Sequence, residues 1–321
     1  MLKEAEKRVT LGDSNIQVSR LCFGTLVMGP LQANLPLQQG VSLLAEAYNQ
    51  GVNFFDTAES YGTYPYLRQL IRVAGRAQLV IATKSYAATS DEAKQSLHRA
   101  LYELNTDYLD IMLLHEQVSL ASLAGHHDAL EYFVKAKKEG LIRAVGLSSH
   151  YLAVVRSAIM VPEIEIVHPL YNREGFGIQG GSAAQMLAAI DECFQMGKGI
   201  YAMKVLGGGH LYRQAAALIQ HVAQQESIHS IAIGMRNAAE LQVNLAWIHQ
   251  SEPPSEVLDE LQAQERRLHI ESHCTACGRC LAHCPAKCLH LVGSRLQVDH
   301  SRCLTCGYCA RVCPDFALKV L

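Results

Sequence analysis

Short apolar runs rich in β-branched residues alternate with longer amphipathic stretches between residues 9 and 250. Eight such runs lie at 20–24, 52–55, 79–83, 109–114, 144–147, 164–167, 200–205 and 228–233. Between them, apolar positions recur at helical spacing, for example at 36–50, 90–104, 129–139, 182–196 and 237–250. Strand then helix, eight times in about 240 residues, predicts an α/β protein with a (β/α)8 barrel.

A doubly wound open sheet is the alternative way to arrange alternating strands and helices. It would normally carry a glycine-rich phosphate-binding turn after an early strand, and the sequence has none at that place. Residues 9–18, which contain Gly12 and Asp13, instead predict a small antiparallel hairpin that closes the bottom of the barrel.

The pattern changes after residue 250. Residues 251–255 (SEPPS) hold the proline pair expected at a domain boundary, and a charged helix is predicted at 256–268. Nine of the 11 cysteines then fall between Cys274 and Cys313. We therefore divide the chain into a barrel (1–250), a linker with a bridging helix (251–270) and a small α+β domain (271–321).

The composition limits the class of protein and its partners. With 49% hydrophobic and 18% charged residues, the 321-residue chain can bury a large core. A net charge of −2 and a pI near 6.7 give no electrostatic reason to bind nucleic acid or anionic lipid. Residues 1–10 lack the apolar core of a signal peptide, and no run approaches the ~18 apolar residues of a membrane span. We expect a cytoplasmic protein that binds neither nucleic acid nor membrane.

Three consecutive predicted strands end in an ionisable side chain. Asp56 follows NFF, Lys84 follows VIAT and His115 follows IMLL. Tyr61 lies in the loop shortly after Asp56. In a (β/α)8 barrel these strand ends meet at the face that carries catalytic residues. Each residue alone has a structural explanation, such as helix capping, but four of them on one rim predict a catalytic site.

The four side chains are also complementary in their chemistry. An ammonium group beside a phenol favours the phenolate, so Lys84, kept charged by Asp56, is expected to lower the pKa of Tyr61 from about 10. Tyr61 would then donate a proton to a carbonyl oxygen as a hydride arrives from a nicotinamide, and take it back in the oxidative direction. His115, neutral beside Lys84, would orient the carbonyl.

These residues stand in motifs that resemble those of the aldo-keto reductase family. The motifs are DTAESYG (56–62), IATKS (81–85), TDYLDIMLLH (106–115), EGLIRAVGLSSH (139–150) and IGMRN (233–237). The resemblance covers residues 9–245 and agrees in order, spacing and strand context. It implies a TIM barrel that binds NAD(P)H without a Rossmann fold, a small-molecule carbonyl substrate, and a catalytic tetrad of Asp56, Tyr61, Lys84 and His115.

The resemblance also implies where the nicotinamide and the pyrophosphate bind. Ser148 and Ser149 occupy the place of a Ser-Asn pair that holds the carboxamide. His168 replaces a usual Gln, and Tyr171 matches a ring that stacks on the nicotinamide. The glycine-rich stretch 204–210 (KVLGGGH) would let backbone N–H groups approach the pyrophosphate. Its predicted binding residues are Leu206, Gly207 and Gly208.

The adenosine end of the nucleotide falls on the eighth predicted strand and the helix that follows. Gly234 and Arg236 belong to the IGMRN motif, and Arg236 occupies the position at which family members bind the 2′-phosphate of NADP. Asn244 occupies the position at which they bind adenine. Glu240 replaces a second phosphate-binding Arg of several members, and its carboxylate would oppose a 2′-phosphate. We expect NADP, with NAD as the alternative.

Two copies of C-x2-C-x2-C-x3-C-P stand 29 residues apart, at 274–285 and 303–314. The spacing is similar to that of bacterial two-[4Fe–4S] ferredoxins, and a reducing compartment favours metal thiolates over disulfides. The resemblance implies a ferredoxin-like domain with two [4Fe–4S] clusters, in which the fourth cysteine of each run binds the other cluster. The implied sets are Cys274, Cys277, Cys280 and Cys313 for cluster 1, and Cys303, Cys306, Cys309 and Cys284 for cluster 2.

Two further features of the tail need an interpretation. Structural zinc is the alternative to the clusters, but it would use two C-x2-C pairs without a third cysteine. Cys288 has no partner in the repeat, because Ala317 holds the corresponding place. We interpret it as a packed free cysteine near a cluster.

The sequence therefore predicts an oxidoreductase that exchanges hydride between NAD(P)H and a carbonyl, with two clusters for electron transfer or redox sensing and a redox protein as a further partner. Two alternatives stay open. One is a redox-responsive regulatory protein that binds nicotinamide with little turnover, and the other is an electron-transfer enzyme fed through its clusters. Because all the predicted catalytic residues precede residue 245, a fragment ending near residue 250 is expected to keep hydride transfer.

Overall fold

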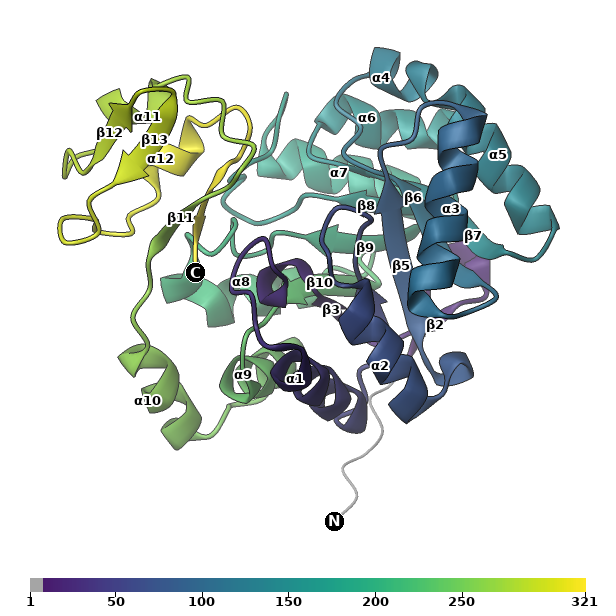
Figure 1. Cartoon of the computed structure of the whole chain (residues 1–321), viewed down its shortest axis with the longest axis horizontal. Coiled ribbons are helices and arrows are strands. Elements are labelled where there is room, and N and C mark those ends of the chain that lie inside the picture. The colour runs from purple at the N-terminus through teal and green to yellow at the C-terminus, as the bar shows by residue number, and fades with distance from the viewer. Residues whose placement is uncertain (1–7) are drawn as a thin grey trace.

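The computed structural model describes residues 8–321, and its largest part is a closed barrel of eight parallel strands (Figure 1). The strands follow one another around the barrel, and β10 pairs with β3 to close it. Each predicted apolar run overlaps one of these strands, so the predicted (β/α)8 barrel is confirmed. The strands are β3 (Leu21–Gly24), β4 (Phe54–Asp56), β5 (Val80–Ser85), β6 (Leu109–Leu114), β7 (Ile142–Ser149), β8 (Ile166–Pro169), β9 (Gly199–Met203) and β10 (Ser230–Gly234).

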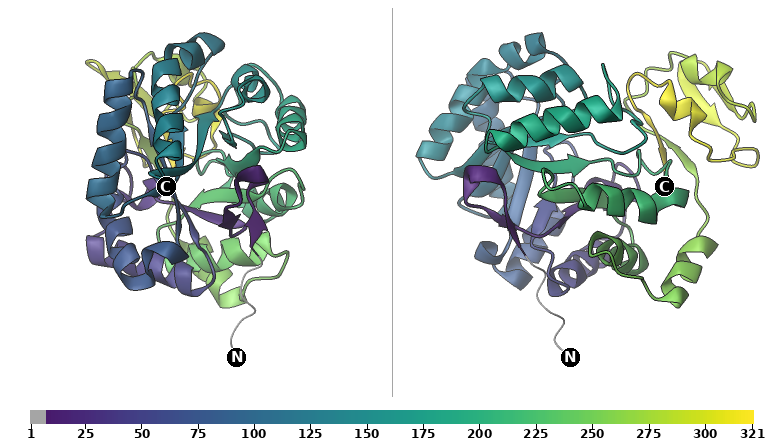
Figure 2. Two further views of the ribbon diagram at one scale, coloured as in Figure 1. Left: turned by 90° about the vertical axis from the view of Figure 1, so that its right-hand side faces the viewer. Right: turned by 180° about the vertical axis from the view of Figure 1, so that it is seen from behind.

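Helices cover the outside of the barrel, as the view in Figure 1 and the two views in Figure 2 show. The third helix shows how the sequence sets their limits, because Thr89 and Glu92 form a capping box at its start and Asn105 ends it in the left-handed conformation. Its buried face carries Leu97 and Leu104. The helices of the barrel are α1 (Leu37–Asn49), α2 (Tyr64–Ala74), α3 (Ser90–Leu104), α4 (Leu120–Gly125), α5 (His127–Lys138), α6 (Leu152–Ser157), α7 (Ala183–Gln195), α8 (Ala215–Ala223) and α9 (Ala238–Ile248).

The predicted hairpin closes one end of the barrel. Its strands β1 (Val9–Thr10) and β2 (Gln17–Val18) pair antiparallel, and Leu11 between them is fully buried among residues of the barrel interior. Gly12 has a φ of +56°, and a Cβ there would lie 2.3 Å from the backbone nitrogen of Gly199. The hairpin therefore fills the end of the barrel opposite the predicted catalytic rim.

The C-terminal domain begins earlier than the sequence indicated. The predicted helix at 256–268 is α10 (Ser255–Ala263), and it ends sooner because the chain becomes extended at Gln264. Strand β11 (Leu268–Ile270) then pairs with the last strand, β14 (Leu318–Val320), so it belongs to the C-terminal domain and not to the linker. The other elements of this domain are α11 (Arg279–Ala282), β12 (Leu289–Val292), β13 (Arg295–Val298) and α12 (Tyr308–Arg311).

No helix within residues 8–321 has the length and apolar character needed to cross a membrane. The expectation about a signal peptide concerns residues 1–10, of which residues 1–7 lie outside the described part of the chain.

Candidate active site

Lys84 and Asp56 form a buried ion pair at the predicted catalytic rim. Asp56 ends β4 and Lys84 lies near the end of the neighbouring strand β5. The Lys84 Nζ atom lies 2.6 Å from Asp56 Oδ2 and donates a second hydrogen bond to the carbonyl oxygen of Thr57 at 2.7 Å. Both side chains are almost fully buried, so the charge of each is compensated by the other.

Tyr61 lies in the loop after β4 with its ring against these two groups. The Lys84 Nζ atom is 5.0 Å from the centre of the Tyr61 ring. Burial, followed by the nearby Asp56 carboxylate, raises the pKa of Tyr61 well above its usual value. The sequence led us to expect a lowered pKa. The difference has a physical reason, because Lys84 donates its hydrogen bonds to Asp56 and Thr57 and faces the Tyr61 ring.

His115 is poised to hydrogen-bond to a ligand in its neutral form. Burial and then the positive charge of Lys84 lower its pKa well below the usual value, so it is uncharged at neutral pH. Its ring stacks on Tyr86 at 4.3 Å and meets Tyr61 edge-on at 5.8 Å. Its Nδ1 atom is buried and has no hydrogen-bond partner among residues 8–321. A buried ring nitrogen without a partner is a position where a bound molecule can supply one.

Asp56 has two further neighbours inside the barrel. The Tyr201 hydroxyl donates a hydrogen bond to Asp56 Oδ1 at 3.0 Å, and His168 Nε2 lies 4.0 Å from the same oxygen. The His168 ring stacks on Tyr201 at 3.8 Å, and burial lowers its pKa to about 4. Sequence reasoning did not identify Tyr201, because a tyrosine within a β-strand is indistinguishable from an ordinary core residue.

The structure does not bring three of the predicted nicotinamide contacts into a common cavity. Ser148 Oγ accepts a hydrogen bond from a backbone N–H of the loop after β6, and Ser149 Oγ donates one to a backbone carbonyl of that loop. Both hydroxyl groups are thus engaged with the backbone. The Tyr171 hydroxyl lies 3.3 Å from Nε2 of His221. Met203, which sequence reasoning passed over, lines the cavity instead.

One cavity of about 970 Å³ extends from Tyr61 to the end of β10. Lys84 and His115 lie against the Tyr61 ring but do not line the cavity themselves. Gly207, Ser148, Ser149 and Tyr171 do not line it either. The cavity has the size of sites that bind small molecules and cofactors. The predicted residues that line it are Asp56, Tyr61, His168, Leu206, Gly208, Gly234, Arg236 and Asn244.

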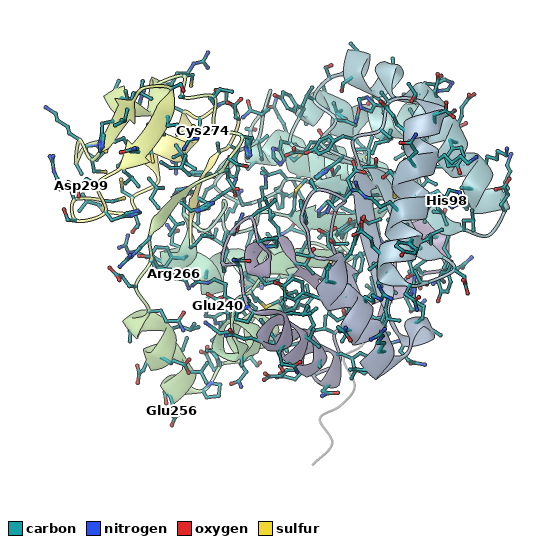
Figure 3. The ribbon with its side chains drawn as sticks, viewed as in Figure 1. His98, Glu240, Glu256, Arg266, Cys274 and Asp299 are labelled. Carbon is teal, nitrogen blue, oxygen red and sulfur yellow. The ribbon has the colours of Figure 1, made fainter. Side chains whose placement is uncertain are left out.

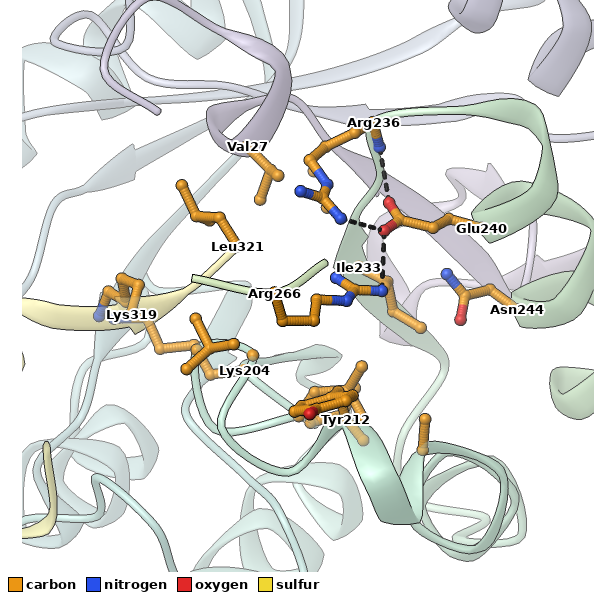
Figure 4. Close-up of a pocket in the computed structure, with 18 of the residues that line it drawn as sticks. Val27, Lys204, Tyr212, Ile233, Arg236, Glu240, Asn244, Arg266, Lys319 and Leu321 are labelled. Atoms are coloured by element: carbon orange, nitrogen blue, oxygen red, sulfur yellow. Dashed lines mark hydrogen bonds and ion pairs between the residues drawn. The ribbon is translucent and has the colours of Figure 1, made fainter. Parts of the chain in front are cut away.

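Two arginines share one carboxylate at the β10 end of this cavity (Figure 4). Arg236 Nη2 lies 2.9 Å from Glu240 Oε1, and Arg266 Nη2 lies 3.1 Å from the same oxygen. The backbone N–H of Arg236 also donates to Glu240 Oε2 at 2.8 Å. Glu240 therefore holds both guanidinium groups at the cavity, and one positive charge remains uncompensated. Arg266 comes from the segment between α10 and β11, where no motif marks it, and lies beside Glu240 in Figure 3.

The C-terminal strand forms a wall of the same cavity. The N–H of Val320 donates to the carbonyl oxygen of Gly208 at 3.0 Å. Gly209 has a φ of +87°, and a Cβ there would lie 1.9 Å from the carbonyl oxygen of Val320. The glycines predicted to admit a pyrophosphate thus also admit the C-terminal strand. The cavity residues supplied by the C-terminal domain are Cys303, Leu304, Thr305, Lys319, Val320 and Leu321.

The eight repeated cysteines surround two separate cavities in the C-terminal domain. The first is lined by Cys274, Cys277, Cys280 and Cys313, and the second by Cys284, Cys303, Cys306 and Cys309 together with the unrepeated Cys288. Thus the fourth cysteine of each run joins the first three of the other. Gly278 and Gly307 have φ values of +75° and +80°, which lets the chain turn closely around each set.

A sequence profile described as the aldo/keto reductase family matches residues 20–270. The chain belongs to the aldo/keto reductase family. A second profile, described as a 4Fe-4S dicluster domain, matches residues 267–314, so this aldo/keto reductase carries an iron–sulfur type domain at its C-terminal side.

Curated relatives and solved structures agree with this assignment. The chain is 25% identical to the NADH-specific methylglyoxal reductase of Escherichia coli, over 52% of this chain and 59% of the relative. It is 26% identical to L-galactose dehydrogenase of Arabidopsis thaliana, over 43% and 47%. The chain thus spans less than two thirds of the length of these relatives. The holo form of an aldo-keto reductase from Bacillus halodurans superposes with a TM-score of 0.64 at 18% identity, covering 80% of this chain and 95% of that one.

Cys288 lies beside the second set of cysteines in this aldo/keto reductase. Its Sγ atom is 3.4 Å from that of Cys284, and the backbone N–H of Cys288 donates to the same sulfur. Burial raises the pKa of Cys288 to about 12, so its thiol is protonated at neutral pH. No group of three or more His, Cys, Asp or Glu among residues 8–321 is placed to hold a single metal ion.

Proposed function

We propose that this aldo/keto reductase exchanges hydride between a nicotinamide nucleotide and an aldehyde or ketone, with Tyr61 as the general acid and base. One observation carries the proposal. Tyr61 and Asp56 line one end of a cavity, with Lys84 and His115 packed next to them, and the other end holds Arg236, Arg266 and Asn244. A cavity with proton-transfer groups at one end and phosphate-binding groups at the other suits a dinucleotide.

The nicotinamide supplies the hydride when it is bound, and the residues of this chain move the proton. Because the pKa of Tyr61 is raised, its hydroxyl keeps its proton at neutral pH and can donate it as the carbonyl oxygen gains negative charge. The Lys84 ammonium, held by Asp56, stabilises the phenolate that remains. Neutral His115 donates a hydrogen bond that orients the carbonyl oxygen. The same groups act in reverse when an alcohol is oxidised.

The proposed nucleotide is NADP, with NAD as the second candidate. Arg236 and Arg266 present two guanidinium groups held in place by Glu240, and an Arg pair is well suited to a 2′-phosphate. Glu240, which the sequence led us to regard as unfavourable, is paired with both arginines and no longer faces the cavity as a lone charge. Leu206, Gly208, Gly234 and Asn244 complete the proposed nucleotide contacts. The Escherichia coli relative is named for NADH, which keeps NAD as a candidate.

The C-terminal domain is proposed to hold two [4Fe–4S] clusters, one in each set of four cysteines. The sets fit this group because each surrounds its own cavity with four sulfur ligands. When bound, clusters supply one-electron chemistry. Anaerobically purified protein should contain about eight irons and eight acid-labile sulfides per chain, and Cys288→Ala should leave both unchanged because the eight repeated cysteines already supply four ligands to each cluster. Tight zinc without visible absorption would contradict this assignment.

An enzyme fed with electrons through its clusters is a second candidate. It is favoured by one observation: Cys303, from the second set of cysteines, lines the same cavity as Tyr61. In this case the substrate would be reduced by single electrons and protons, and a redox protein would be the donor.

The proposed role of Tyr61 is tested by Tyr61→Phe under anaerobic conditions. We expect kcat for carbonyl reduction to fall by about 10²–10⁴-fold, because a positioned proton donor contributes about that much, while the Kd of the nicotinamide nucleotide stays within twofold. Tyr102→Phe is the matched control, since Tyr102 is 81% exposed on α3, and it should not change kcat. A Tyr61→Phe enzyme with wild-type kcat would remove Tyr61 from the mechanism.

A further inference from the structure

Two lysines line the active-site cavity without a carboxylate next to either. Lys204 follows β9 and Lys319 lies on β14, so one comes from the barrel and the other from the C-terminal domain. Lys319 is only 7% exposed. Among residues 8–321, neither Nζ atom has a carboxylate oxygen within 4.0 Å. A buried ammonium group without an anionic partner is costly, and an anionic group of a bound molecule would offset that cost.

The two ammonium groups converge on the same ring. The Nζ atoms of Lys204 and Lys319 lie 4.7 Å and 3.6 Å from the centre of the Phe316 ring. Lys204 Nζ is also 2.8 Å from His150 Nε2, and Lys319 Nζ donates to the carbonyl oxygen of Phe316. Gly208 makes room for this arrangement, because a Cβ there would lie 2.8 Å from Lys319 Cδ.

Two carboxylates lie in this region but form no ion pair with either lysine, and one of them, Glu116, lies 3.8 Å from His150 Nε2, the atom that also contacts Lys204. Glu116 accepts a hydrogen bond from the hydroxyl of Tyr86 at 2.6 Å, and Glu271 accepts one from Gln32 at 2.6 Å. Burial lowers the pKa of Lys204 to about 8, in spite of both carboxylates. Burial and then the charge of Lys204 lower the pKa of Lys319 well below its usual value. An anion between the two lysines would favour the charged form of both.

The lysines lie at the catalytic end of the cavity. The charge of Lys204 contributes to the lowered pKa of His115 and of His168, and the cavity that they line contains Tyr61. Figure 4 shows Lys204 and Lys319 on one side of the pocket and Glu240 and Asn244 on the other, with Arg266 between. The two lysines are therefore placed to contact a negative group on the reacting molecule, and not one at the adenosine end of the nucleotide.

We propose that Lys204 and Lys319 bind a carboxylate of the substrate, so that the carbonyl compound is an oxo acid. This inference rests on the proposed carbonyl reduction at Tyr61 and names its substrate class. It also gives the C-terminal domain a part in substrate recognition, because Lys319 and the ring beneath both lysines belong to that domain. A neutral carbonyl compound would leave both ammonium groups without an anionic partner.

The test compares oxo acids with their neutral methyl esters in the full-length protein. Glyoxylate, 4-oxobutanoate and 4-formylbenzoate are each paired with the methyl ester, so that three distances between carbonyl and carboxylate are sampled. We expect kcat/KM for at least one acid to exceed that of its ester at least tenfold. Lys319→Met and Lys204→Met should each lower this ratio about tenfold or more through KM, because a charge-assisted contact is lost. Arg295→Gln removes one exposed charge from the same domain and should leave the ratio unchanged.

A binding measurement separates this inference from the proposed function. Calorimetry with the non-reducible acids benzoate and butanoate, without nucleotide, should show binding that Lys319→Met or Lys204→Met weakens. If carbonyls are reduced but acids and esters react alike and neither acid binds, the lysine site is refuted and the proposed function stands. If neither acids nor esters are reduced but the acids bind through the lysines, the proposed function fails instead. If the lysine variants weaken the binding of NADPH as much as the binding of the acids, the lysines contact the pyrophosphate and the inference is overturned.

Discussion

The barrel and the C-terminal domain are stabilised in different ways. The barrel has an apolar interior in which residues such as Phe54 and Tyr201 are fully buried, and a second apolar layer beneath its helices. In the C-terminal domain, many of the buried side chains are cysteines or belong to the last strand, which packs on the barrel. A domain of this size with so small a core needs metal ligation or docking to stay folded.

The predicted catalytic residues and the walls of the cavity therefore do not come from the same regions of the chain. The predicted catalytic residues all lie on the well-packed barrel. However, Arg266 and Lys319 line the same cavity from the linker and the C-terminal domain. The expectation that a fragment ending near residue 250 keeps hydride transfer considered only the catalytic residues. The structure changes that expectation, because such a fragment lacks one wall of its cavity.

The largest effect is expected inside the barrel, from Lys84→Met. We expect kcat to fall at least about 100-fold and the pH–rate profile to change, because the phenolate of Tyr61 loses its cation. The variant also leaves Asp56 buried without its ion-pair partner, which costs about 3–5 kcal/mol of stability. The double variant Asp56→Asn/Lys84→Met should regain stability, measured by denaturant unfolding, without regaining kcat. Recovery of both would show that Lys84 acts only through stability.

Removal of iron should affect the other region. Oxidative loss of the clusters is expected to unfold the C-terminal domain first, because its thiolates then repel one another and little core remains. Hydrogen exchange should become fast in β11–β14 and stay slow in β4–β6. The KM for the nucleotide should rise about tenfold or more, since the wall made by Val320 and Leu321 is lost. Simultaneous unfolding of both regions would contradict the comparison.

A smaller effect is expected where the two regions meet, at the shared carboxylate. Arg236→Ala and Arg266→Ala should each weaken NADPH by roughly ten- to hundredfold, the range for a hydrogen bond to a charged group, and leave NADH within a few-fold. Glu240→Arg should shift the preference further toward NADPH. Equal losses for both nucleotides, measured by fluorescence titration, would contradict the assignment to the 2′-phosphate.

The smallest effect concerns pH, and two histidines of the barrel report on it, one of which contacts the C-terminal strand. Burial lowers the pKa of His168 and of His210 to about 4. His210 Nε2 lies 2.9 Å from the carbonyl oxygen of Leu318 in the last strand. Because an unfolded histidine titrates near 6.5, the unfolded chain binds more protons below that pH, so stability is present above pH 6.5 and is lost as pH falls toward 4.

The slope is about 1.4 kcal/mol per pH unit for each histidine. His210→Asn should remove the pH dependence of the free energy with which the C-terminal domain docks on the barrel. The pH dependence of the free energy of unfolding of the barrel should remain. Thermal unfolding at pH 7, 6 and 5, with cluster absorption followed in parallel, measures both. An unchanged docking slope in His210→Asn would refute the role of His210.

Much of the fold and part of the site were predictable because both are local in the sequence. The strand ends at Asp56, Lys84 and His115 follow from the eightfold pattern, and the resemblance to two-cluster ferredoxins implied how the cysteines group. The contacts that sequence reasoning missed join distant segments. Tyr201 contacts Asp56 inside the barrel, and Arg266 of the linker contacts Glu240 of the barrel. No local sequence pattern encodes either contact.

Other expectations differed because one sequence feature can serve two structural purposes. The glycine-rich loop at 204–210 indicated a close approach of backbone, but the group that approaches in the structure is the strand of Val320. A lysine next to a tyrosine indicated a lowered pKa of the phenol, yet burial and Asp56 act in the opposite direction on Tyr61. The sign of such an effect depends on the orientation of side chains, which the sequence does not contain.

The central claim is that hydride reaches the substrate from a nicotinamide at the Tyr61 end of the cavity, and that the clusters do not feed the reaction. It is tested by a single anaerobic turnover of protein whose clusters have first been reduced with stoichiometric dithionite, using NADPH that carries two deuterium atoms at C4 of the nicotinamide, with the visible absorption of the clusters recorded throughout. We predict one deuterium on the carbinol carbon of the product and no change in cluster absorption. A product without deuterium, formed while the clusters become oxidised, would contradict it.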